Sequence, residues 1–189
     1  MREKHLIIDN DHFFAKEKRY PIRSIEKIYF YYVQTQKRIN FAAAGVDHDV
    51  TIRLYLSGKP EPITFNSLGH IRFGNAGKKA SESLIAKLNH LCSETFRDRL
   101  SKYLMHLHHN GFFVYDGKQI CQNGDVIADR WKFNLRNDRP ILKSPFAIFY
   151  ERKKESGILR KTEKYEIQTR FDSDVFFSIL ENTFGLKWG

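Results

Sequence analysis

Hydrophobic and polar residues follow a similar order twice along this chain. Residues 6–28 and 112–135 each begin with an apolar stretch, turn at a DN or DG signal and return as a second short stretch. After a polar break, each continues into a further strand with alternating pattern. Each half later ends in a segment whose apolar residues recur with the helical period. The sequence therefore predicts an α+β fold of two similar antiparallel β modules in tandem, each closed by a C-terminal amphipathic helix.

The first module is expected over residues 1–110. Turn residues separate short alternating stretches, as in antiparallel sheets, and the spacing change near Lys27 indicates a bulge. Polar residues 34–40 read as a connection, and the glycine-bearing basic stretch 66–79 reads as a loop. The expected strands are residues 6–9, 12–16, 20–23 at an edge, 24–33, 50–56 and 63–65.

A long helix over about residues 81–109 should close the first module. Ser81 or Ser83 is placed to cap its start, and Gly111 follows its end as a left-handed C-terminal cap. Apolar residues in steps of three and four run through more than five turns' length of chain. They are Leu84, Ile85, Leu88, Leu91, Cys92, Phe96, Leu100, Tyr103, Leu104 and Leu107.

The second module is expected over residues 111–189. Asp116-Gly117 is a strong hairpin signal, and Asp172 is placed to cap a final helix over about residues 173–184, which Gly185 ends. The charged segment 151–161 reads as a hairpin loop. The expected strands are residues 112–115, 119–122, 126–128, 130–135, 146–150 and 165–171.

The composition of the chain indicates more about its binding partners than about any reaction it catalyses. The 189 residues carry a formal net charge of +10, which favours anionic partners, although plain solubility explains such a charge equally well. No window approaches the length of an apolar membrane span, and the N-terminal residues lack a signal core, so a cytoplasmic protein is expected. Two cysteines are too few for a disulfide scaffold.

The order of these segments resembles that of bacterial PH-like (pleckstrin-homology-like) domains. In the second half the resemblance rests on the DG hairpin, the WKFNL strand, the basic hairpin and the FDSDVFFSILENTFG end. In the first half IRSIEKIYF, TIRLYL and PITF resemble a weaker copy with a longer helix, which either ends an independent module or also packs against the second. The resemblance implies a scaffold for lipid headgroups, peptides or partner proteins, rarely for catalysis.

Two basic segments are candidate anion sites. Lys78, Lys79 and Ser81 lie where a glycine-bearing loop meets a helix start, where backbone N–H groups suit an anion; the alternative is a flexible basic loop with an N-cap. The second segment would project from the sheet toward phosphates, or be a solvated turn whose acids offset its charge. Its basic residues are Arg152, Lys153, Lys154, Arg160 and Lys161.

Other constellations are weaker. His106 and His109 have a spacing that suits a metal but lack a third ligand, and the helix dipole also favours histidine there, so no metal is expected. Aromatic and basic residues mix over residues 30–38, as in stacking platforms for single-stranded nucleic acid, although strand aromatics are usually core. No motif predicts a cofactor or a catalytic residue.

Three functions remain as hypotheses. The first is a non-catalytic binding or adaptor protein for a protein partner or an anionic lipid surface. The second is a nucleic-acid-binding protein that uses the same basic loops. The third is an enzyme of unrecognised type, which requires a concave pocket with convergent polar groups.

Overall fold

A computed structural model gives the conformation of most of the chain. It describes residues 2–3, 6–15, 17–39, 42–69, 76–129, 131–138, 140–144, 147–154 and 161–186. Within these ranges only the backbone is described at residues 2–3, 36–39, 42–45, 68–69, 76–77, 140–144, 151–154 and 161–164.

The chain divides into two compact units. Unit 1 is Met1–Asp98 and unit 2 is Arg99–Gly189. The division falls inside helix α1 (Ala76–Asn110), so the last turns of this helix belong to unit 2. The fold is mixed α+β, with open and mainly antiparallel sheets, one long helix and a second helix at the C-terminal end.

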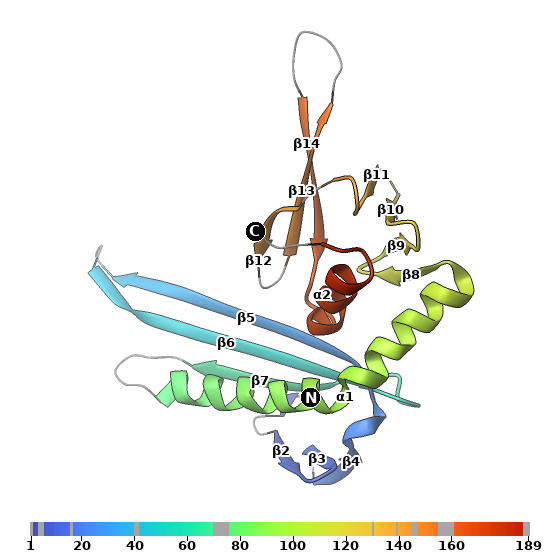
Figure 1. Cartoon of the computed structure of the whole chain (residues 1–189). Coiled ribbons are helices and arrows are strands. Elements are labelled where there is room, and N and C mark those ends of the chain that lie inside the picture. The colour runs from blue at the N-terminus through green and yellow to red at the C-terminus, as the bar shows by residue number, and fades with distance from the viewer. Residues whose placement is uncertain are drawn as a thin grey trace. The chain divides into compact units, whose positions relative to one another are not determined.

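Unit 1 contains two sheets beside α1 (Figure 1). The small sheet has the order β2-β3-β4, and the large sheet has the order β1-β7-β6-β5, in which only β1 runs parallel to its neighbour. The strands are β1 (Arg2–Glu3), β2 (Ile7–Asp9), β3 (His12–Ala15), β4 (Lys18–Pro21), β5 (Ile25–Ile39), β6 (Ala42–Leu56) and β7 (Ile63–Gly69), with a 3-10 turn η1 (Ile22–Ser24) before β5.

A single core joins the two sheets of unit 1 to α1. Alternate residues of β6 and one stripe of α1 are removed from water together with residues of β3 and β5. The fully buried members include Phe13, Ile52, Leu54, Phe65 and Leu91, all with exposed fractions of 0 %. This shared core fixes the small sheet and α1 on the same side of the large sheet.

Unit 2 contains two further sheets and the second helix. The strands β8 (Phe112–Tyr115), β9 (Lys118–Cys121), β10 (Asp125–Ala128) and β11 (Trp131–Asn134) pair in chain order. The strands β12 (Pro140–Ser144), β13 (Ala147–Lys154) and β14 (Lys161–Gln168) form the other sheet, and helix α2 (Ser173–Asn182) follows.

Aromatic residues fill the core of unit 2. The inward row Phe113, Ile120, Val126 and Phe133 runs straight across its first sheet, one residue from each paired strand. From the second sheet, the ring of Tyr150 lies 4.3 Å from that of Phe133. Helix α2 contributes Phe176, whose ring stacks on Tyr115 at 3.7 Å.

Several predicted boundaries are wrong for the same reason. Residues 34–40 and 151–161 were expected as a connection and a loop, but β5 continues to Ile39, β13 to Lys154, and β14 begins at Lys161. Backbone pairing between the strands forms these extensions, and their sequences lack an alternating apolar pattern, so hydrophobic periodicity does not reveal them. Strand β12 was missed altogether, because a proline begins it and its sequence is short.

The local turn predictions are confirmed. The DG hairpin forms with Gly117 at φ 68°, and Gly111 ends α1 at φ 75°. The bulge expected near Lys27 appears as a register shift between Ile25 and Lys27. These features depend on a few neighbouring residues, which is why the sequence alone predicts them.

Candidate binding groove

A groove runs along α1 beside the β2–β3 turn in unit 1. It has a volume of about 730 Å³, within the range in which proteins bind small ligands and short peptides. One wall comes from the end of β2 and its turn, and the other from successive turns of α1. The lining residues are Ile8, Asn10, Asp11, Ser83, Ala86, Lys87, His90 and Glu94.

The periodicity of α1 places the helix wall. Leu84, Leu88 and Leu91 are buried in the core of unit 1. Ser83 and Lys87, one turn apart, and Ala86, His90 and Glu94, also one turn apart, therefore form a neighbouring stripe. This stripe flanks the buried one, and its residues line the groove together with Ile8, Asn10 and Asp11 of the small sheet.

The opposite wall is held by a tight turn. Asn10 adopts φ 48°, a left-handed conformation that asparagine tolerates better than most residues. The carbonyl of the next residue, Asp11, accepts a hydrogen bond from the backbone N–H of Ile22 at 2.8 Å. This bond ties the β2–β3 turn to η1 and fixes the position of Asp11.

A second cavity of about 350 Å³ adjoins the groove. Asp11 and Glu94 line both, and the remaining lining residues are His12, Pro21, Ile22 and Arg23. His12 Nδ1 lies 3.2 Å from Nη2 of Arg19. Two carboxylates therefore mark the junction between the cavities, while cationic or imidazole side chains lie on either side of it.

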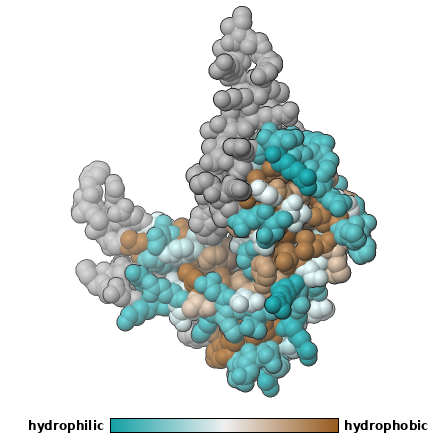
Figure 2. Space-filling view, viewed as in Figure 1, coloured by the Kyte–Doolittle hydropathy of each residue, from teal (hydrophilic) through white to brown (hydrophobic). Residues whose placement is uncertain are grey.

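The groove combines side chains of both charges with apolar surface. In the space-filling view, hydrophilic and hydrophobic residues are intermixed over this part of unit 1 (Figure 2). Two carboxylates, an ammonium group, an imidazole, a hydroxyl and an amide offer both donors and acceptors. Such a lining suits a ligand with its own polar backbone and mixed charges better than a simple anion.

The predicted anion site at the start of α1 has a different geometry. The helix begins at Ala76 rather than at Ser81 or Ser83, because the alanines and lysines before Ser81 are themselves good helix formers. Lys78 and Lys79 are therefore exposed residues of the first turns, and Lys78 pairs with Glu82 at 3.7 Å.

Ser81 is buried inside α1 instead of capping it. Its hydroxyl donates to the carbonyl of His48 at 3.5 Å and lies 3.4 Å from the hydroxyl of Ser67. These contacts hold the helix to β6 and β7. They direct Ser81 toward the sheet, so Lys78 and Lys79 do not share an exposed site with it.

The second basic segment lies on paired strands. The register places Arg152 opposite Glu163, Lys153 opposite Thr162 and Lys154 opposite Lys161. Arg160 lies outside the described residues, and the side chains of the other four basic residues are likewise outside them. The site predicted here stays a prediction, although an acidic cross-strand neighbour for Arg152 reduces the local positive charge.

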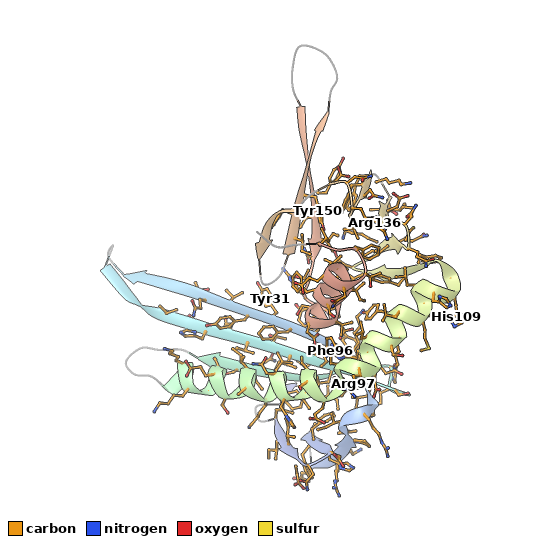
Figure 3. The ribbon with its side chains drawn as sticks, in the orientation of Figure 1. Tyr31, Phe96, Arg97, His109, Arg136 and Tyr150 are labelled. Atoms are coloured by element: carbon orange, nitrogen blue, oxygen red, sulfur yellow. The ribbon has the colours of Figure 1, made fainter. Side chains whose placement is uncertain are left out.

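The predicted aromatic platform on residues 30–38 is divided between two faces of β5. Phe30 and Tyr32 pack against the core of unit 1, which agrees with the alternative given above, that aromatic residues in strands usually belong to the core. Tyr31 lies on the face opposite α1 (Figure 3). On that face the guanidinium of Arg53 lies 5.0 Å from the ring centre of Tyr29.

The three histidines near the end of α1 are exposed. His106 Nδ1 lies 3.2 Å from the amide nitrogen of Asn110, and the rings of His108 and His109 are in contact at 5.4 Å. His109 projects outward from the end of the helix (Figure 3). In the described part of the chain, no group of three or more histidine, cysteine or acidic residues is arranged to hold a metal ion.

A buried ion-pair cluster in unit 2 was not predicted. Nη1 of Arg99 donates to Oδ1 of Asp172 and to Oδ1 of Asp174, both at 2.9 Å, and Nη2 donates to Oδ2 of Asp174 at 2.6 Å. The hydroxyl of Tyr103 donates to Oδ2 of Asp172 at 3.0 Å. Burial, reinforced by the adjacent Asp172 carboxylate, raises the pKa of Tyr103 far above its ordinary value.

This cluster explains why Asp172 does not act as the expected side-chain cap. The residue does precede α2, as predicted, but its carboxylate makes no capping hydrogen bond because Arg99 and Tyr103 take it. The exposed fractions of the Arg99 and Asp172 side chains are 0 % and 1 %. We therefore interpret the cluster as a structural tie between the end of α1 and α2.

No protein-family model, curated protein or solved structure matches this chain. Within the described residues, neither helix has an apolar stretch long enough to cross a membrane. Functional inference therefore depends on the geometry of the groove and on the charges around it.

Proposed function

We propose that this is a non-catalytic binding protein that recognises a segment of a protein partner through the groove between α1 and the β2–β3 turn. The observation that carries the proposal is the lining of this groove, which offers donors, acceptors and both charges along about 730 Å³. A peptide presents a matching mixture of backbone N–H, C=O and side-chain charges, whereas a phosphate presents only acceptors.

The element order supports two PH-like modules as the scaffold for this function. Unit 2 contains a four-stranded meander, a three-stranded meander and a closing helix in chain order. Unit 1 contains a three-stranded meander, the β5–β7 meander and then α1. We propose that the units are related modules, with the end of the first helix also serving the second unit.

An anionic lipid surface or a nucleic acid is the second candidate, favoured by the net charge of +10. Local pairing argues against it at the predicted sites. Lys78 has Glu82 as its ion-pair partner, and Arg152 lies opposite Glu163. The groove itself carries Asp11 and Glu94, which would repel a phosphate.

Photo-crosslinking of the full chain in a lysate of the source organism at about 150 mM salt tests the proposal. Sedimentation with phosphatidylglycerol vesicles and with a mixed DNA and RNA pool runs in parallel. We expect a discrete protein adduct that Glu94→Lys removes and that Glu82→Lys, the same charge reversal outside the groove, leaves intact. Retention on vesicles or nucleic acid at this salt, without such an adduct, would refute the proposed function.

A further inference from the structure

Strand β2 is an edge strand of the small sheet, and its residue Ile8 lines the groove. In the small sheet β2 pairs with β3, and Asp9 lies opposite His12 across the two-residue turn. In such a hairpin the pair next to the turn exchanges hydrogen bonds, and the following pair does not. The following pair is Ile8 and Phe13, so the N–H and C=O of Ile8 point away from β3.

Ile8 is also the β2 residue that lines the groove. Its side chain packs against the core of unit 1, which keeps the strand in place. Its backbone N–H and C=O, which point away from β3, are therefore one donor and one acceptor at the edge of a strand that adjoins the groove. An edge strand that lies beside a helix can add one extended peptide strand between them.

The helix wall leaves room for a strand of this kind. Ser83 and Ala86 are small, so the groove is open where α1 passes β2, and Lys87 and His90 supply polar groups further along. Asp11 and Glu94 form the acidic junction with the adjoining cavity. The charge complement of this junction is an arginine or lysine side chain on the occupant.

We propose that the groove binds an extended segment of a partner protein as an added strand on β2. The segment pairs through its backbone with Ile8 and places a basic side chain between Asp11 and Glu94. This inference rests on the proposed function, because it specifies how the protein partner is held. It also sets the chemistry of that partner: a basic residue within a stretch that can extend.

Short random peptides displayed on phage, selected on the immobilised full chain at about 150 mM salt, supply the probe. We expect enriched peptides with arginine or lysine at one fixed position and with β-forming neighbours. The strongest peptide is then synthesised and its dissociation constant measured by fluorescence anisotropy. We expect Glu94→Lys to weaken binding by about tenfold or more and Glu82→Lys to leave it within about twofold.

Strand addition is tested separately from charge. Ile8→Pro removes the outward N–H, and Ile8→Ala removes more of the side chain but keeps that N–H, so only Ile8→Pro should abolish strand pairing. We expect Ile8→Pro to weaken peptide affinity about tenfold more than Ile8→Ala does, because a carbonyl of the bound peptide is then buried without a hydrogen-bond donor. A peptide N-methylated at each backbone position in turn makes the same test on the unaltered protein, should Ile8→Pro fail to fold.

The outcomes separate this inference from the proposed function. Loss of binding on N-methylation at one alternate set of peptide positions, together with the Ile8→Pro effect, supports strand addition. Peptide binding that is indifferent to both changes overturns strand addition while leaving a peptide-binding function in place. Failure to enrich any peptide overturns the inference, and the cross-linking experiment then decides the proposed function independently.

Discussion

Replacing Arg99 by leucine should destabilise unit 2 more than any ordinary helix substitution. The guanidinium donates charge-assisted hydrogen bonds to Asp172 and Asp174, and its own exposed fraction is 0 %. Leucine would leave the Asp172 carboxylate, with an exposed fraction of 1 %, buried without its cation. Asp174, with an exposed fraction of 31 %, would recover part of its hydration.

The expected loss follows from the unpaired charge rather than from the number of bonds. Removing one partner of a buried ion pair costs about 3–5 kcal/mol, whereas replacing the whole pair by apolar groups is often neutral. We expect Arg99→Leu to cost about 3–4 kcal/mol, at the lower end because Asp174 is partly hydrated. With a urea m-value of about 2 kcal/mol/M, this moves the unfolding midpoint down by about 1.5–2 M.

Urea unfolding followed by tryptophan fluorescence measures this loss. Trp131 packs against Phe133 and Tyr165 in unit 2, so its fluorescence reports that unit. Lys102→Leu is the matched control, because Lys102 is an exposed basic residue of the same helix within unit 2 and its loss should change stability by less than about 0.5 kcal/mol.

A double-mutant cycle identifies the cause. Asp172→Asn removes the buried carboxylate charge that Arg99→Leu leaves unpaired. The stability lost in the double variant Arg99→Leu/Asp172→Asn should therefore be smaller, by at least about 1 kcal/mol, than the sum of the losses in the two single variants. The reasoning is refuted if Arg99→Leu costs less than about 1 kcal/mol, or if the two substitutions are strictly additive.

Three further predictions concern other polar groups of unit 2. In the described part of the chain the buried hydroxyl of Tyr150 has no hydrogen-bond partner, so Tyr150→Phe should stabilise by about 1 kcal/mol in urea unfolding, and a loss would contradict this. A hydrogen bond from Lys132 lowers the pKa of Asp125 from 3.8 to about 2. The Asp125 carboxylate therefore stabilises the folded state above about pH 4, and this stabilisation is lost as the pH falls toward 2. In the Asp125→Asn variant, stability should fall less between about pH 4 and about pH 2 than in the unaltered protein. An identical dependence of stability on pH in the two proteins would contradict this prediction. Because burial raises the pKa of Tyr103, that group favours the folded state below about pH 10 and loses this contribution as the pH rises. Ultraviolet titration should show the phenolate of Tyr103 only after the protein unfolds in alkali. Tyr103→Phe should therefore reduce the phenolate absorbance that appears on alkaline unfolding.

The sequence predicts the parts of the fold that depend on neighbouring residues. The hairpin at Asp116-Gly117, the C-terminal cap at Gly111 and the bulge near Lys27 are all present, because turn chemistry is local. The extension of β5 to Ile39 and the start of α1 at Ala76 were missed. The first depends on backbone pairing along the β5–β6 hairpin, which hydrophobic periodicity does not record. The second depends on the helix propensity of the residues before Ser81, which carry no apolar period.

The groove could not be predicted in the same way. Asp11 is recognisable as an acid in a turn, and Lys87, His90 and Glu94 follow one another at helical spacing. A polar helix stripe is, however, the ordinary solvent face of any amphipathic helix. It becomes a wall only because the shared core places β2 beside α1, and that placement is a tertiary contact.

The distribution of charge separates the groove from the basic character of the whole chain. Binding driven by a net charge of +10 would weaken steeply with salt, because phosphate contacts release counterions. Among the described residues that line the groove, the carboxylates of Asp11 and Glu94 accompany the single ammonium group of Lys87, so the groove does not share the basic character of the whole chain. Main-chain pairing at Ile8 adds bonds between neutral groups, which salt screens little. As salt rises, a peptide bound there should lose only the part of its affinity that comes from its single basic side chain between Asp11 and Glu94. An anion held by the basic segments should lose affinity steeply, so one salt titration distinguishes the two modes.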